Sequence, residues 1–228
     1  MTGAVLLDVD GTLVDSNYLQ VMAWVRAFRD ESIEVDAWTV HRSLGQAGPQ
    51  LVERVTRARG LRLDDDTTER VLDAHSRRAE ESFDLLRAFD GAADLVRAVR
   101  HRGARPVLAT SASPDSLEHL RGVLGVDEEL HAVTSSADVE VSKPEPDLVH
   151  VALEAAGVGP EDAVFVGDSV WDALAAARAG IPCVAVLSGG VGEAELRDAG
   201  AVEVYDDVAD LLAHLDESVL ARAWTTGT

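Results

Sequence analysis

Cysteine, lysine and long apolar segments are all scarce in this chain of 228 residues. The single cysteine, Cys183, excludes a disulfide within the chain, and its apolar neighbours predict a buried structural thiol. No segment approaches the ~20 apolar residues that a membrane-spanning helix needs. The first apolar run, 5–7, ends at Asp8 with no basic residues before it, unlike a secretory signal. We therefore expect a soluble protein of the cytoplasm, with no membrane partner.

Positive charge is also scarce, because 20 basic residues stand against 41 acidic ones, for a formal net charge of −21. A net negative charge of this size repels nucleic acids and anionic lipids, which proteins bind through basic patches. A phosphorylated substrate would therefore need a local cation, either fixed in the site or recruited to it. Nineteen of the basic residues are arginine and one, Lys143, is lysine. A bias in nucleotide composition explains the arginines but not this exception.

The chain does contain enough apolar sequence, 46% of its residues, to form a core. Residues 4–9 are typical of a short buried strand that ends at a turn-forming Asp-Gly pair. From 16 to 90 the apolar residues follow helical spacing and predict three or four helices. After Gly91, strands and helices alternate. The predicted strands are 105–110, 131–135, 163–167, 182–187 and 201–205, and the predicted helices are 91–102, 114–124, 146–157, 170–179, 193–199 and 207–215.

Repeated strand–helix–strand units predict an α/β fold with a Rossmann-like parallel sheet and helices on both faces. The strand at 4–9 fits this later block and not the helical segment that follows it. We therefore predict an α/β core domain formed by 1–15 and 91–228, with an α-helical cap domain, 16–90, inserted after the first strand. The last dozen residues are expected to form a frayed tail.

Polar side chains follow the predicted strands at the edge where open parallel sheets bind their ligands. Asp8 and Asp10 follow the first strand, Thr110 ends the second and Asp168 follows the fourth, while Lys143 lies in a turn before a helix. Clustered carboxylates are unfavourable unless a hard cation neutralises them, and oxygen ligands suit Mg²⁺. Mg²⁺ would also supply positive charge that the chain lacks. Lys143 and Thr110 could then contact phosphoryl oxygens.

Each of these patterns has a structural interpretation when it is taken alone. The segment 10–12 is a common turn, 110–111 and 167–168 can cap helices, and Lys143 can be a solvated side chain. Asp8 is harder to explain in this way, because a carboxylate that ends an apolar strand is unfavourable without a partner. The order of the patterns, each near a strand end, favours a functional site.

Four segments resemble, in order, the four signature motifs of the haloacid dehalogenase (HAD) superfamily. They are 8–16 (DVDGTLVDS), 107–111 (VLATS), 142–144 (SKP) and 164–172 (VFVGDSVWD). The resemblance extends over most of the chain. The helical insertion after the first motif resembles the caps of phosphoglycolate phosphatases and β-phosphoglucomutases.

The resemblance implies a Mg²⁺-dependent phosphatase that hydrolyses a small phosphomonoester through an aspartyl-phosphate. Asp8 would be the nucleophile, and Asp10 would protonate the leaving alcohol and then deprotonate the attacking water. Thr110 would orient the phosphoryl group, and Lys143 would offset its charge and that of Asp8. The partner would be a small phosphorylated metabolite.

The resemblance also implies a metal site. Mg²⁺ would be held by the Asp8 carboxylate, the backbone carbonyl of Asp10 and the Asp168 carboxylate. Asp172 lies one helical turn further along the chain, and it is expected to support the site without binding the metal.

Contacts with the rest of the substrate are expected from Ser111 and from the cap. Gly45, in the loop 44–48, can approach the site closely because it has no side chain. Arg42 could bind a second anionic group, although an ordinary surface arginine is equally compatible with the sequence. None of the seven histidines falls at a predicted strand end in the site, and none is assigned a role. Trp171 is expected to pack into the sheet.

A β-phosphoglucomutase-like sugar phosphomutase, which uses the same aspartyl-phosphate, is the main alternative. Dehalogenase activity is disfavoured, because family dehalogenases lack the second aspartate that Asp10 provides. Phosphonatase activity needs a cap lysine, and 16–90 contains none. A catalytically silent binding protein would be favoured by a missing motif residue, but all are present. The identity of the phosphate ester and the choice between monomer and homodimer are left open.

Overall fold

A six-stranded parallel sheet forms the centre of the computed structural model, which describes residues 2–139 and 141–224. The strand order is β3-β2-β1-β4-β5-β6, so the first strand in sequence lies in the middle of the sheet. All four residues of β1 are buried, as expected for a central strand that pairs on both sides. The strands are β1 (Ala4–Leu7), β2 (Arg105–Ala109), β3 (Ala132–Thr134), β4 (Ala163–Gly167), β5 (Cys183–Val186) and β6 (Ala201–Tyr205).

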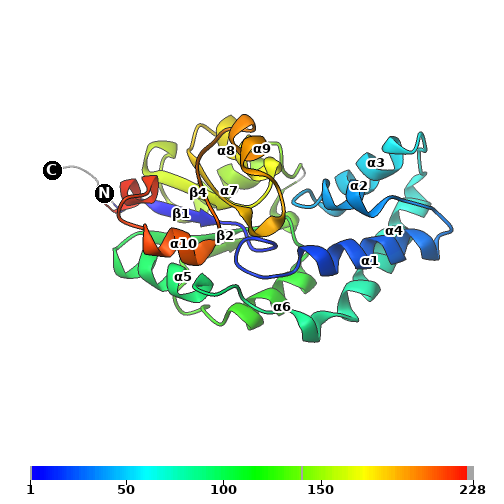
Figure 1. Ribbon diagram of the computed structural model, residues 1–228, viewed down its shortest axis with the longest axis horizontal. Coiled ribbons are helices and arrows are strands. Elements are labelled where there is room, and N and C mark those ends of the chain that lie inside the picture. Colours follow the sequence, from blue (N-terminus) through cyan, green and yellow to red (C-terminus); the bar gives the residue numbers. More distant parts are fainter. Residues whose placement is uncertain (1, 140, 225–228) are drawn as a thin grey trace.

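Helices cover both faces of this sheet, as Figure 1 shows. Side chains alternate along each strand, so that Val5 and Leu7 join one apolar cluster while Ala4 and Leu6 join the other. The first cluster includes residues of α5 (Ala92–His101), α6 (Pro114–Leu124) and α10 (Val208–Ala213). The second includes residues of α7 (Asp147–Ala156), α8 (Val170–Arg178) and α9 (Glu193–Asp198).

The segment between β1 and α5 is helical and has an apolar cluster of its own. It consists of α1 (Asn17–Asp30), α2 (Ala37–His41), α3 (Gly48–Ala58) and α4 (Asp65–Glu80), followed by a 3₁₀ turn (Phe83–Leu85). The cluster includes Trp24 and Phe28 of α1 together with Val55 and Val71 from the later helices. Figure 1 shows this segment beside the sheet, on the side away from the N-terminus. We call it the cap.

The α/β fold class is confirmed, and the predicted elements differ from the observed ones mainly at their ends. The first strand stops at Leu7 and not at residue 9, because the N–H groups of Thr12, Leu13 and Val14 turn back to the carbonyl of Val9. The expected frayed tail is wrong for the part that the structure describes. A 3₁₀ helix (Val219–Ala223) packs against the sheet there, with Leu220 fully buried.

The limits predicted for the two domains, 1–15 with 91–228 and 16–90, remain a prediction, although the cap has its own apolar cluster. Cys183 is buried, as predicted. Among the described residues, no helix is both long enough and apolar enough to cross a membrane.

Candidate active site

The turn after β1 brings the first two aspartates to the carboxyl end of the sheet. The N–H of Asp8 still donates to the carbonyl of Val166 on β4, at 2.9 Å, so its backbone continues the strand pairing. Gly11 then reverses the chain with a positive φ of 74°. A Cβ atom at Gly11 would lie 2.5 Å from Asp168 Oδ2 and 2.2 Å from Asn17 Nδ2, so a side chain would collide with the site. This turn therefore requires glycine.

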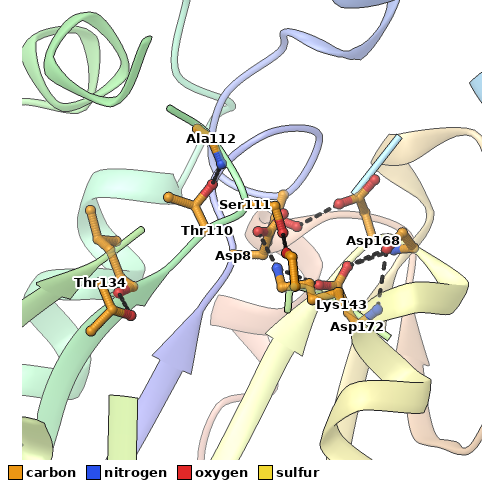
Figure 2. Close-up of polar contacts among 12 residues, drawn as sticks. Asp8, Thr110, Ser111, Ala112, Thr134, Lys143, Asp168 and Asp172 are labelled. Atoms are coloured by element: carbon orange, nitrogen blue, oxygen red, sulfur yellow. Dashed lines mark hydrogen bonds and ion pairs between the residues drawn. The ribbon is translucent and has the colours of Figure 1, made fainter. Parts of the chain in front are cut away.

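Lys143 lies between two carboxylates in the interior of the protein (Figure 2). Its Nζ is 2.6 Å from Asp8 Oδ1 and 2.7 Å from Asp172 Oδ1, and its side chain is fully buried. Burial lowers the pKa of Lys143, but Asp172 and Asp8 outweigh this effect and raise it overall, so the ammonium stays charged. The other oxygen of Asp172 accepts hydrogen bonds from the backbone N–H and the hydroxyl of Ser169. Both oxygens of Asp172 are thus engaged by protein groups.

Asp168 follows β4 and accepts two hydrogen bonds from the segment after β1. Thr12 Oγ1 donates to its Oδ1 at 2.8 Å, and Asn17 Nδ2 donates to its Oδ2 at 2.9 Å. Burial raises the pKa of Asp168 to about 7, with a further contribution from Asp172, while these two hydrogen bonds lower it. Burial also raises the pKa of Asp8 well above its usual value, despite the opposing effect of Lys143. The site therefore holds more negative charge than its single ammonium compensates.

A divalent metal ion fits this donor set. One oxygen from each of Asp8, Asp168 and Asp172 lies within 4.8 Å of the others, and all three residues are buried. Such oxygen-only sites are typical of hard cations. Asp172 Oδ1 faces the Lys143 ammonium and its Oδ2 accepts two hydrogen bonds from Ser169, whereas each oxygen of Asp168 accepts only one, from a neutral group. Asp8 and Asp168 are therefore the better candidates for ligands.

Asp10 is partly exposed to a cavity, and the start of the cap holds its side chain. Ser16 Oγ donates to Asp10 Oδ1 at 2.5 Å. Burial raises the pKa of Asp10 above its usual value. Gln20 Oε1 is 2.8 Å from Nε2 of His75 on α4, and since an amide oxygen can only accept, the histidine nitrogen donates. This hydrogen bond joins α4 to α1 beside the cavity that Asp10 lines.

Thr110 and Ser111 follow β2 and lie beside the same cavity, as predicted from their place after a strand. The hydroxyl of Thr110 accepts from the N–H of Ala112 at 3.1 Å, which fixes the loop around it. Ser111 Oγ is 2.8 Å from Ser142 Oγ, next to Lys143, so the second and third sequence motifs touch at this point.

The cavity lies between the cap and the carboxyl ends of the strands, with a volume of about 460 Å³. Asp8 and Asp10 line it at the sheet. Apolar side chains of the cap also line it, and so do side-chain amides and hydroxyls. The apolar residues are Trp24, Leu44, Ala47, Pro49, Leu51 and Leu72, and the polar ones include Gln46, Gln50, Ser76, Ser113, Ser116 and Ser136.

Gly45 lines the cavity, and its positive φ of 92° brings the cap loop against the loop after β4. A Cβ there would lie 2.7 Å from Ser169 Oγ. Arg42 does not line the cavity. Its guanidinium instead forms a bidentate ion pair with Glu195 on α9. A role for Arg42 in substrate binding therefore stays a prediction, and this geometry gives it no support.

The prediction that Trp171 packs into the sheet is wrong, because Trp171 belongs to neither apolar cluster of the sheet. The guanidinium of Arg54 on α3 lies 4.6 Å from the centre of its ring, and Gly45 packs beside it. Cap residues thus cover Trp171.

Three site residues received no role from the sequence. Asn17 is the first residue of a helix whose sequence shows only the pattern expected of a cap helix. Gln20 lies one turn later, at a spacing that any amphipathic helix shows. His75 could be found only by knowing that α4 packs against α1, which no local pattern reveals.

The parallel α/β fold and the position of the site define a class of enzymes that carry a pair of aspartates directly after the first strand of the sheet. A family model for haloacid dehalogenase-like hydrolases matches residues 2–180, so the chain belongs to this family. It is 30% identical over 217 residues to a phosphoglycolate phosphatase of Rhodospirillum rubrum, covering 92% of this chain and 90% of that protein. It is 31% identical to a plasmid-encoded phosphoglycolate phosphatase of Cupriavidus necator, covering 96% of each. A crystal structure of a hydrolase from Pseudomonas syringae superposes with a TM-score of 0.91 and 34% identity, covering 94% of this chain and 98% of that one. The predicted family is confirmed.

Proposed function

We propose that this phosphatase hydrolyses a small phosphomonoester, with Mg²⁺ as cofactor and an aspartyl-phosphate intermediate on Asp8. The observation that carries the proposal is the contact of Lys143 Nζ with Asp8 Oδ1 at 2.6 Å, beside the cavity into which Asp10 also faces. A carboxylate that one cation holds by one oxygen presents its other oxygen in a fixed direction. That is the requirement for a nucleophile.

In the first step, Asp8 Oδ2 attacks phosphorus, and the bond from phosphorus to the ester oxygen breaks. The leaving alkoxide takes the proton of Asp10, whose raised pKa suits it to carry one. In the second step, Asp10 accepts a proton from water, whose oxygen attacks phosphorus and releases inorganic phosphate and the Asp8 carboxylate. Ser16 holds Asp10 in place for both transfers.

Three groups stabilise the phosphoryl oxygens in this proposal. Lys143 contributes a buried positive charge, and Thr110 and Ser111 contribute polar groups at the end of β2. Asp8 and Asp168, with the Asp10 carbonyl, would hold Mg²⁺, which when bound supplies charge that offsets the phosphoryl group. Asp172 keeps Lys143 in position from the opposite side.

A panel of phosphomonoesters, assayed for release of inorganic phosphate with Mg²⁺ and with EDTA, tests this function. We expect hydrolysis that depends on the metal, together with acid-stable ³²P on the protein that is lost in Asp8→Asn. Hydrolysis without any label in rapid-quench samples would contradict the covalent intermediate. A sugar phosphomutase would instead isomerise its substrate and depend on a bisphosphate primer, and the same assays would reveal it.

A further inference from the structure

Side-chain amides are scarce in this chain, and all of them lie around the active-site cavity. The sequence contains one asparagine, Asn17, and three glutamines, which are Gln20, Gln46 and Gln50. All four line the cavity between the cap and the sheet. The asparagine is the first residue of α1, and its Nδ2 donates to Asp168 Oδ2 at 2.9 Å. The single asparagine of the chain therefore lies where the cap meets a candidate metal ligand.

Three neighbours enclose Oδ2 of Asp168. Asn17, which is only 5% exposed, covers this oxygen with its amide. A Cβ atom at Gly11 would lie 2.5 Å from Oδ2, and a Cβ atom at Gly189 would overlap it, so both backbones pack directly against it. Gly189 lies in the 3₁₀ turn that follows β5. Little space is left beside Oδ2, whereas Oδ1 accepts one hydrogen bond, from Thr12.

Hydrogen bonds hold the loop after β5 against the metal ligand. His41 on α2 lies with its Nε2 at 2.9 Å from the carbonyl of Gly189, and since a carbonyl can only accept, the histidine donates. Tyr18 of α1 stacks on His41 with 5.4 Å between the ring centres. Ser188 Oγ donates to the carbonyl of Gly11 at 2.7 Å. The cap and the turn after β1 therefore fix the two glycine backbones that enclose the carboxylate oxygen.

The two common hard cations differ in how they use a carboxylate. Mg²⁺ is small and requires a near-ideal octahedron of ligands at about 2.0–2.1 Å. Ca²⁺ takes about six to eight oxygens in a flexible arrangement, often with both oxygens of one carboxylate. A carboxylate with one enclosed oxygen can offer only the other, and it is held in a fixed orientation. Such a ligand suits Mg²⁺ and withholds an oxygen from Ca²⁺.

We propose that Asn17 and the backbone of Gly189 limit Asp168 to one metal-binding oxygen, Oδ1, and thereby favour Mg²⁺ over Ca²⁺. Asn17 is a positioning residue in this proposal, because it acts through Asp168 and not on the ion. The inference rests on the proposed function, in which Asp168 holds the metal. It places a determinant of metal selectivity in the cap, at the residue that begins α1.

The dissociation constants of the two cations, measured without substrate, test the proposal. Metal-free protein is titrated with Mg²⁺ or with Ca²⁺, and the rise in melting temperature with metal concentration gives Kd for each. In the parent, we expect the lower Kd for Mg²⁺.

The change in Asn17→Ala should differ between the two metals. Kd for Mg²⁺ should rise ~10-fold, because loss of a group that orients a ligand typically lowers metal affinity by ~10–100-fold. Kd for Ca²⁺ should rise by less than ~3-fold, because Ca²⁺ gains access to the second oxygen of Asp168. The ratio of Kd for Ca²⁺ to Kd for Mg²⁺ should therefore fall by at least ~3-fold.

Three further variants separate this effect from a general loss of structure. Asn17→Leu removes the same donor but fills the space, and it should lower the ratio as Asn17→Ala does. Thr12→Val removes the hydrogen bond to Oδ1, so both constants should shift by a similar factor and the ratio should stay within ~2-fold of the parent. Gln50→Ala removes an amide of the same cavity that comes from α3, and it should change neither constant by more than ~2-fold.

The outcomes separate the inference from the function beneath it. An unchanged ratio in both Asn17 variants, in protein shown to be folded by circular dichroism, would overturn the inference and leave the phosphatase function standing. An equal fall of the ratio in Thr12→Val would also overturn it, because Oδ2 would then have no special part. So would a parent that binds Ca²⁺ more tightly than Mg²⁺. A parent that binds neither cation would refute the metal site, and with it both the inference and the metal dependence of the proposed function.

Discussion

Lys143→Arg keeps the charge in the site and changes only the shape of the group that carries it. The Cζ carbon of arginine occupies the place of the lysine Nζ along the side chain, and its terminal nitrogens extend ~1.3 Å further. Lys143 Nζ is 2.6 Å from Asp8 Oδ1 and 2.7 Å from Asp172 Oδ1. A guanidinium nitrogen aimed at either oxygen would come within ~1.3 Å of it, whereas a charged hydrogen bond needs ~2.8 Å.

The substitution therefore forces Asp8, Asp172 or the turn around residue 143 to move by more than ~1 Å. A displacement of that size at a nucleophile typically lowers the rate by ~10²-fold, which corresponds to ~2.7 kcal/mol of barrier. Overpacking of a fully buried position should also lower the free energy of unfolding by about 1–3 kcal/mol. Removal of the charge in Lys143→Met leaves two buried carboxylates without their cation and should destabilise by about 3–5 kcal/mol.

The assay is kcat/KM on the best ester of the panel, with unfolding in urea to confirm that each variant is folded at the assay temperature. We expect Lys143→Arg to resemble Lys143→Met more than the parent. Arg97→Lys, an exposed position on α5, is the matched control and should change kcat/KM by less than twofold. If Lys143→Arg keeps activity within threefold of the parent, the argument from the compact ammonium is refuted.

The other predictions concern the nucleophile, the metal and the cavity. Asp8→Asn should fold and lose at least ~10³-fold in kcat, about 4 kcal/mol of barrier, and activity within tenfold of the parent would exclude it as the nucleophile. EDTA should abolish activity and Mg²⁺ restore it and raise the melting temperature, while Ca²⁺ should substitute poorly; unchanged melting with Mg²⁺ would contradict the metal site. His75 has a pKa of about 3 when folded and ~6.5 when unfolded, so the unfolded state binds the extra proton and stability falls as the pH drops below 6.5. From pH 7.5 to 5.5 the parent should lose ~1.4 kcal/mol more unfolding free energy than His75→Gln, and equal losses would contradict a neutral buried histidine.

The parallel sheet could be predicted because its strands are buried on both faces and appear in the sequence as short, continuous apolar runs. The end of the first strand could not, since Val9 is as apolar and as buried as the strand before it. Its carbonyl accepts three turn hydrogen bonds instead of a strand partner. The C-terminal segment was misjudged for a similar reason, because a single 3₁₀ helix has too few residues to show a periodic pattern.

The sheet side of the site was predictable and the cap side was not. Asp8, Thr110 and Asp168 each follow a strand, and the fold rule for parallel sheets brings such residues together without further information. Arg42 was a candidate because of its charge, but Glu195 on α9 pairs with it, and no local pattern links these two positions. Spacing along the chain does not encode contacts of this kind between helices.

Charge balance explains why the residues alone predict a cation, whereas its ligands were implied only by the family resemblance. Asp8, Asp168 and Asp172 are buried together, and Lys143 is the one basic side chain that contacts any of them in the described part of the chain. Three carboxylates and one ammonium leave two negative charges, which a divalent cation would neutralise. The choice among the carboxylates depends on hydrogen bonds that only the fold creates. Asp172 Oδ1 faces the Lys143 ammonium and its Oδ2 accepts two hydrogen bonds from Ser169, so Asp172 is a poorer candidate ligand than Asp168, whose oxygens each accept one hydrogen bond from a neutral group.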